Sequence, residues 1–207
     1  HDIMWIGTYS GGVNYCDFNQ KKIKQYTFSE DDNEYLSDFT VFAITKDKNN
    51  NLWLGTEKAG LGFFNINMES CEFNVADDND QFFSGTNIKC LTWGENDDLW
   101  IGTYMGGLRC YSLSTKTLVK YTHDKNDSNS LANDVIYAIE ADKHNNLWVG
   151  TREGIDMLPH RGDRFIHYKN DPGELYGLGR FRVVMIYKDN EDNISVSYTH
   201  LTLPTNR

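Results

Sequence analysis

Short, mainly apolar runs separated by polar turns recur along the chain. Four such runs lie at residues 41–44, 88–91, 136–139 and 183–186. Each is followed by a turn rich in Asp or Asn, such as residues 46–51. Segments this short do not hold the i, i+3, i+4 stripe of an amphipathic helix, and Asp, Asn and Gly favour tight turns. The pattern therefore predicts short β-strands joined by hairpins.

The strands belong to a repeating unit. An apolar residue followed by Trp, an apolar residue, Gly and Thr occurs four times, at 4–8, 52–56, 99–103 and 147–151, and the tryptophans are 48, 47 and 48 residues apart. A Gly-containing turn follows each copy, then a third strand and a fourth that ends in an aromatic residue. Four short antiparallel strands in a unit of about 47–48 residues are typical of a β-propeller blade. The sequence therefore predicts an all-β fold, a β-propeller fragment of four-stranded antiparallel blades.

The repeat also sets the domain organisation. The predicted blades lie at 2–28, 39–75, 87–122 and 134–168, and the first strand of a next blade lies at 181–188. The links between them are acidic or rich in Asn, as solvent-exposed loops are. Residues 1–194 thus form one partial propeller. Because the chain starts at His1 inside a repeat, we expect it to be a piece of a longer protein.

Residues 195–207 do not follow the repeat. The register requires a fifth Trp near position 195, but Ser195 stands there. Residues 196–205 read Val-Ser-Tyr-Thr-His-Leu-Thr-Leu-Pro-Thr, which resembles the translation of a transposon-end adapter used in shotgun sequencing. A divergent edge strand is the alternative. We expect the native sequence to depart from this one after Ile194 and to continue with Trp-x-Gly-Thr, so this tail is excluded from functional reasoning.

Composition and charge exclude several functions. The 207 residues carry 20 Lys and Arg against 30 Asp and Glu, for a formal net charge of −10. A nucleic-acid-binding surface or a polybasic membrane anchor needs a net positive footprint. No apolar run approaches the roughly 20 residues of a membrane-spanning helix. We therefore expect this fragment to contact no nucleic acid.

The composition of the repeat points to one family. The repeat combines an apolar strand, an Asn-rich turn, Leu-Trp-Ile-Gly-Thr, Gly-Gly-Leu at 106–108 and an acidic loop at 124–134. It has neither the Gly-His and Trp-Asp pairs of WD blades nor the kelch pattern. From residue 2 to about residue 194, the chain closely resembles the two-component regulator propeller repeat.

This resemblance implies a place and a set of partners. Such blades form seven-bladed propellers in the periplasmic sensor region of hybrid two-component histidine kinases. The resemblance implies an oligosaccharide ligand, further blades and sensor domains in the same parent chain, a downstream histidine kinase and a homodimer. It implies no enzyme activity and no cofactor for the fragment itself. Two alternatives stay open: a secreted propeller polysaccharide lyase or hydrolase, and a protein-interaction propeller without a small-molecule ligand.

Positions that recur in every blade are assigned to structure. We expect the repeated Trp to pack between blades, the Gly to allow close backbone approach and the Thr hydroxyl to bond a backbone group. These residues are Trp5, Trp53, Trp100, Trp148, Gly7, Gly55, Gly102, Gly150, Thr8, Thr56, Thr103 and Thr151. Cys16, Cys71, Cys90 and Cys110 take places that other blades give to apolar residues, so we expect buried free thiols.

The residue directly after each Gly-Thr pair differs from blade to blade. It is Tyr9, Glu57, Tyr104 and Arg152 in order. These residues lie in the turns between second and third strands, at a face where propellers usually bind ligands. Rings that stack on sugar faces beside charged groups suit a carbohydrate. We predict a ligand site at these four residues, with variable solvent-facing turns as the alternative. No Ser/His/Asp set, His cluster or calcium loop is evident, so no catalytic or metal-binding residue is predicted.

Overall fold

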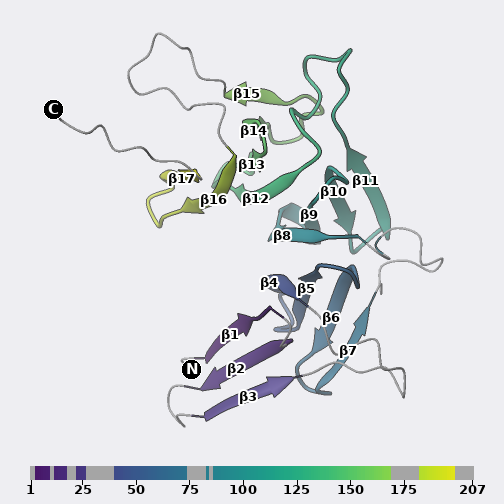
Figure 1. The fold of residues 1–207 in the computed structure, drawn as a ribbon, viewed down its shortest axis with the longest axis vertical. Helices are drawn as coiled ribbons and strands as arrows, with labels where there is room; N and C mark the ends of the chain where they lie inside the picture. Colours follow the sequence, from purple (N-terminus) through teal and green to yellow (C-terminus); the bar gives the residue numbers. More distant parts are fainter. Residues whose placement is uncertain are drawn as a thin grey trace, which may run out of the picture.

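A computed structural model of the chain describes residues 3–9, 12–17, 22–26, 40–73, 83, 86–168 and 182–198. Within them the hairpin pattern forms five antiparallel sheets, which we call blades 1 to 5 (Figure 1). Blade 1 has three described strands, blades 2 to 4 have four each, and blade 5 has two. Within each blade, the strands pair in sequence order. The predicted all-β fold of four-stranded antiparallel blades is confirmed.

The strand bounds follow the sequence repeat. Blade 1 consists of β1 (Ile3–Gly7), β2 (Val13–Asp17) and β3 (Lys22–Tyr26). Blade 2 consists of β4 (Val41–Lys46), β5 (Leu52–Thr56), β6 (Leu61–Asn65) and β7 (Ser70–Phe73). Blade 3 consists of β8 (Ile88–Trp93), the short 3₁₀ turn η1 (Glu95–Asp97), β9 (Asp98–Thr103), β10 (Leu108–Ser112) and β11 (Thr117–Tyr121). Blade 4 consists of β12 (Ile136–Ala141), β13 (Leu147–Thr151), β14 (Gly154–Leu158) and β15 (Ile166–Tyr168), and blade 5 of β16 (Val183–Lys188) and β17 (Ile194–Tyr198).

Some predicted features lie outside the described residues. These are the blade ends at 2, 27–28, 39 and 74–75, the links at 29–38 and 170–180, most of the link at 76–86, residue 181 and the tail residues 199–207. Residues 195–198 form most of β17, which pairs with β16. Strand pairing does not test where these residues come from. The expected change of sequence after Ile194 therefore stays a prediction.

The first strands of blades 2 to 5 form the inner edge of the molecule. β4, β8, β12 and β16 contact one another in this order, and the later strands of each blade lie progressively farther out (Figure 1). Apolar side chains gather between blades. Separate clusters of buried residues join blades 1 and 2, 2 and 3, 3 and 4, and 4 and 5. The core is therefore a series of layers between neighbouring sheets.

The Gly of the repeated pattern lies against the next blade. Each faces the residue that opens the following blade's first strand, in the pairs Gly7 and Val41, Gly55 and Ile88, Gly102 and Ile136, and Gly150 and Val183. A Cβ added to any of these glycines would come within 2.8 Å of its partner. Such an overlap would force the blades apart, so this close approach requires the missing side chain.

The repeated Trp and Thr side chains also make recurrent contacts. Trp5 packs edge-on against Phe64 of blade 2, with ring centres 5.9 Å apart, and Trp53 meets Trp93 of blade 3 at 6.1 Å. The Trp side chains of blades 3 and 4 contact the clusters shared with the following blade. The Thr hydroxyls donate to a glycine carbonyl oxygen of the next turn at 3.0, 2.9, 2.7 and 3.1 Å, from Thr8, Thr56, Thr103 and Thr151 in order.

One Asp builds the turn between the first and second strands. Oδ1 of Asp47, Asp142 and Asp189 accepts the backbone N–H groups two and four residues ahead, at 2.8 to 2.9 Å. In blades 2 and 4 the other carboxylate oxygen also accepts the indole N–H of the repeated Trp, at 3.4 and 3.1 Å. The Asp therefore ties the turn to the Trp strand. Blade 3 has Gly94 at this place.

Candidate functional site

A β-bulge occurs at the same place in the first strand of blades 2 to 5. The pairing with the second strand shifts by one residue there, which leaves Phe42, Lys89, Tyr137 and Val184 outside the register. A bulge re-aims the side chain of its extra residue. Phe42 and Val184 are exposed, whereas Val41 and Val183 beside them are buried. The inner strands thus present a row of varied side chains, one from each blade.

This row meets two of the predicted ligand residues between blades 2 and 3. Nζ of Lys89 lies 3.4 Å from the centre of the Phe42 ring and 5.8 Å from the centre of the Tyr104 ring. The carboxylate of Glu57 interacts electrostatically with the same ammonium group. We call Phe42, Glu57, Lys89 and Tyr104 the Lys89 cluster.

The cluster combines a partly desolvated cation with aromatic rings. Burial lowers the pKa of Lys89, and the negative charge of Glu57 acts in the opposite direction. The rings hold the ammonium group through their negative faces. With less water around it, the ammonium group interacts more strongly with a ligand acceptor. Two rings, one amine and one carboxylate in one cluster are suited to a ligand that has both hydroxyl groups and apolar C–H faces.

The predicted ligand residues occupy one position of the repeat. The backbone N–H of Glu57, Tyr104 and Arg152 donates, in each case, to the carbonyl oxygen of the residue before that blade's first strand. The structure brings Glu57 and Tyr104 to Lys89. The Tyr9 and Arg152 side chains are exposed and take no part in the Lys89 cluster within the described residues.

Sequence reasoning missed the bulge residues Phe42, Lys89 and Tyr137 because they lie in runs read as buried strand. An internal comparison gives the signal that could have found them. The bulge position holds Phe, Lys, Tyr and Val, whereas the position before it always holds Val or Ile. A second cation–π contact, 5.2 Å from the Arg182 guanidinium carbon to the Tyr137 ring centre, repeats the arrangement between blades 4 and 5.

A His–Asp pair lies away from this row, on the outer part of blade 4. His167 Nδ1 is 2.7 Å from Asp156 Oδ1, and its Nε2 is 2.9 Å from the Ser128 carbonyl oxygen. The Asp156 carboxylate is buried and also accepts the backbone N–H of Ala132 at 2.7 Å. Both ring nitrogens thus lie within hydrogen-bond distance of an oxygen, one in blade 4 and one in the loop before it. The pair therefore clamps this loop against blade 4.

Three of the four cysteines have the character of unreactive thiols. All four are free, and they are half-buried rather than buried as expected. Burial raises the pKa of Cys71 and Cys110 to about 12 and raises that of Cys90 as well. The reactive thiolate is therefore scarce in these three at neutral pH.

The described residues hold no group of three or more His, Cys, Asp or Glu side chains placed to bind a metal ion. Nor do they contain a helix with the length and apolar character needed to cross a membrane.

Comparisons with known proteins connect this geometry to a family of repeats. The family model described as two component regulator propeller matches residues 34–58 and 130–153. These segments contain the first two strands of blades 2 and 4. Comparison with curated protein sequences gives no match. The resemblance to this repeat, inferred from the sequence, is confirmed.

Solved structures share the fold. The extracellular domain of BT4673, a hybrid two-component system of B. thetaiotaomicron, superposes with a TM-score of 0.73 at 22% identity, over 95% of this chain and 25% of that one. The extracellular domain of BT3049 of the same organism superposes with a TM-score of 0.67 at 19% identity, over 95% of this chain and 30% of that one. Virginiamycin B lyase of Staphylococcus aureus was solved as an inactive variant with quinupristin. It superposes with a TM-score of 0.65 at 12% identity, over 97% of this chain and 67% of that one.

The lengths and the matches together define what the chain is. It spans about a quarter of the length of the BT4673 domain, and at these identities the superpositions show a common fold. The matched segments fall on strands that the repeat itself defines. The chain is thus a run of β-propeller blades, and two of them, blades 2 and 4, contain segments that match the two-component regulator propeller model.

Proposed function

We propose that the chain is part of the periplasmic sensor region of a bacterial hybrid two-component system and binds an oligosaccharide at the Lys89 cluster. The observation that carries the proposal is the Lys89 ammonium group held against Phe42 and Tyr104 beside the Glu57 carboxylate. The matched repeats and the fold shared with two extracellular sensor domains support the setting. The partners are further blades, sensor domains and a histidine kinase of the same parent chain, together with a second copy of that chain.

The mechanism follows from the position of the cluster between two blades. Phe42 and Glu57 come from blade 2, whereas Lys89 and Tyr104 come from blade 3. A sugar ring packs its C–H face on the aromatic side chains, while the amine and the carboxylate bond its hydroxyls. A ligand that touches both blades favours the arrangement in which they are correctly spaced. It thereby shifts the population of sensor states toward one signal.

A binding experiment on this chain tests the proposal. We expect a panel of neutral and acidic trisaccharides to include one that raises the melting temperature without being cleaved. Lys89→Ala should weaken its binding by about tenfold or more, because one charge-assisted hydrogen bond to the ligand is lost together with the two cation–π contacts that hold the Lys89 cluster. The matched control is Lys58→Ala, which removes an exposed lysine from the turn that carries Glu57. Isothermal titration calorimetry measures both variants.

Other outcomes would assign the chain elsewhere. Cleavage of the trisaccharide would place the chain with propeller lyases or hydrolases. Binding to protein alone would make it an interaction platform. Equal affinities for wild type and Lys89→Ala would reject the Lys89 cluster as the site.

A further inference from the structure

Blade 3 departs from the repeat at the turn between its first and second strands. Gly94 replaces the Asp that ties this turn to the Trp strand in blades 2 and 4. A Cβ built on Gly94 would fall 2.7 Å from Nε1 of Trp100, so the indole occupies space that the Asp side chain would need. The indole N–H of Trp100 is left without a hydrogen-bond partner among the described residues. This donor is available to a ligand.

Blade 4 departs from the repeat in the turn between its third and fourth strands, which faces Gly94 and the Trp100 indole of blade 3. Its third and fourth strands are joined by residues 159–165, whereas residues 66–69 and 113–116 suffice in blades 2 and 3. The longer turn reverses at Arg161, whose φ is +56°, and the Gly162 N–H donates to the Pro159 carbonyl oxygen at 2.8 Å. Arg161 is exposed and pairs with no carboxylate in the described part of the chain.

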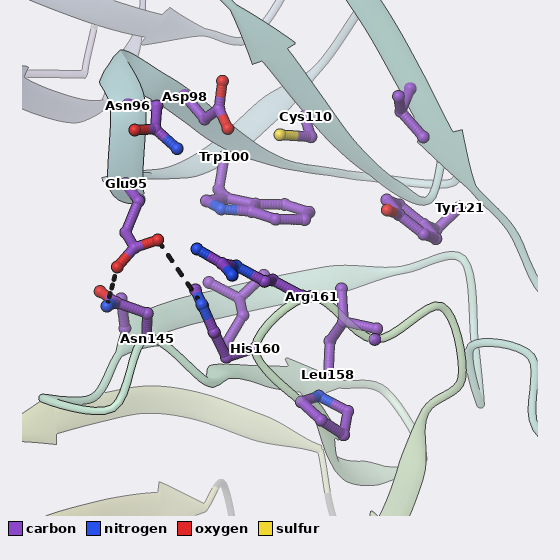
Figure 2. Close-up of a pocket in the computed structure, with 16 residues that line it drawn as sticks. Glu95, Asn96, Asp98, Trp100, Cys110, Tyr121, Asn145, Leu158, His160 and Arg161 are labelled. Carbon is purple, nitrogen blue, oxygen red and sulfur yellow. Dashed lines mark hydrogen bonds and ion pairs between the residues drawn. The ribbon is translucent and has the colours of Figure 1, made fainter.

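The two departures enclose a cleft of about 240 Å³ between blades 3 and 4 (Figure 2). Both lining blades have a neighbour on their other side, so the cleft does not arise from an open edge of the propeller. It lies at the opposite end of the blades from Glu57 and Tyr104, because successive antiparallel turns alternate between ends. Glu95 links its two walls: Oε1 accepts from Asn145 Nδ2 at 2.5 Å, and Oε2 lies 3.6 Å from His160 Nε2.

The cleft is polar at one end and apolar at the other. Glu95, Asn96 and Asp98 lie at the polar end, near the nitrogen of the Trp100 indole (Figure 2). Tyr121 and Leu158 lie at the other end, where the Tyr121 hydroxyl is turned toward Trp100, and the Trp100 and Tyr121 rings, 5.9 Å apart and inclined by 32°, form one wall. Arg161 reaches into the cleft opposite Trp100. A ligand that satisfies all of these groups has an anionic group, a cationic group and a short apolar body.

We infer that this cleft is a binding site for a free α-amino acid with an apolar side chain. The α-carboxylate pairs with Arg161 and accepts the Trp100 indole N–H, two donors that have no partner among the described residues. The α-ammonium group lies at the polar end of the cleft, which carries the Glu95 and Asp98 carboxylates. The side chain lies along Trp100 and Tyr121 toward Leu158.

Titration calorimetry of the 207-residue chain with L-leucine tests the inference. We expect leucine to bind, and N-acetyl-leucine and leucinamide, which each lack one of the two charges, to bind about tenfold more weakly or worse. Arg161→Ala should weaken leucine binding by a similar factor. Arg164→Ala is the matched control, because Arg164 is an exposed residue of the same turn outside the cleft. Lys89→Ala should leave leucine binding unchanged, which separates this site from the proposed oligosaccharide site.

A second variant closes the cleft by restoring the repeat. Gly94→Asp adds a side chain where the Trp100 indole now lies, so the indole must shift and its N–H gains a carboxylate partner, as in blades 2 and 4. We expect this variant to abolish leucine binding, with folding checked by circular dichroism. The inference is overturned if leucine does not bind, if its two blocked analogues bind as well as leucine, if glucose binds more tightly, or if Arg161→Ala has no effect.

Discussion

At the scale of single residues, the missing side chain of each patterned glycine sets the spacing between blades. Gly102 shows this most directly, because an added methyl group would overlap the Cys90 sulfur and come within 2.7 Å of Ile136 Cγ2. Gly102→Ala should therefore lower the free energy of unfolding by about 1–3 kcal/mol, the usual cost of overpacking a core. Urea denaturation measures the loss.

The neighbouring sulfur gives this prediction an internal control. Cys90 stands where blades 2 and 4 have Ala43 and Ala138. Cys90→Ala in the Gly102→Ala background should recover part of the stability, because the overlap with sulfur disappears while that with Ile136 remains. A Gly102→Ala protein as stable as wild type would contradict the steric role of this glycine.

At the scale of elements, the sequence predicts what repeats and misses what departs from the repeat. Strands, hairpins and the Gly-Thr turns follow from a pattern that occurs four times. The Lys89 side chain was not recognised, because a one-residue bulge is invisible to an alternation of apolar and polar positions. Gly94 gives no signal of its own in the sequence, because its effect depends on the Trp100 indole, six positions along the chain. Contacts between blades need coordinates, since periodicity fixes only each blade's own register.

The Asp turn of blade 4 predicts a specific response to acid. Burial alone would raise the pKa of Asp142, but hydrogen bonds from Asn146 and Trp148 outweigh it and hold the pKa below its ordinary value. A carboxylate with a lowered folded pKa stabilises above its unfolded pKa of about 3.9, and this contribution is lost as pH falls through the folded pKa. Asp142→Ala should cost about 1–3 kcal/mol at pH 7.

The gap in unfolding free energy between wild type and Asp142→Ala should narrow as the pH is lowered below about 4. Urea titrations at pH 7, 4 and 3 would show this narrowing. Asp189→Ala is the matched control, because Asp189 holds the same turn without an indole partner and should cost less. A gap that stays constant from pH 7 to pH 3 would show that the charge of Asp142 is not the stabilising feature.

At the scale of the whole molecule, every proposed site lies between blades. The larger contacts between sheets join blades that are neighbours in sequence, so each junction is a separate unit with its own side chains. The junction of blades 2 and 3 carries the Lys89 cluster. The junction of blades 3 and 4 carries the cleft beside Gly94, at the opposite end of the blades. The repeated strands form the scaffold, and one or two substitutions at a junction between blades create a binding site.

The junction at blade 5 provides a test of the repeat itself. Ser195 pairs with Tyr187 at the register where blades 2 and 4 place Trp53 and Trp148. Asp189 forms the turn as Asp142 does, and its Oδ2 accepts from Asn193 Nδ2 at 2.8 Å, as Asp142 Oδ2 does from Asn146 at 2.9 Å. An acceptor for an indole N–H is therefore already in place.

Ser195→Trp should raise the free energy of unfolding by about 1 kcal/mol, the net value of one hydrogen bond, on top of any gain from burying the ring. Ser195→Phe is the matched control, since it adds an aromatic ring without an N–H. We expect the Trp variant to exceed the Phe variant in urea denaturation, and Asp189→Ala to erase the difference. Equal stabilities for the two would mean that the turn of blade 5 does not recognise an indole, and the expectation of a native Trp at this position would lose its structural support.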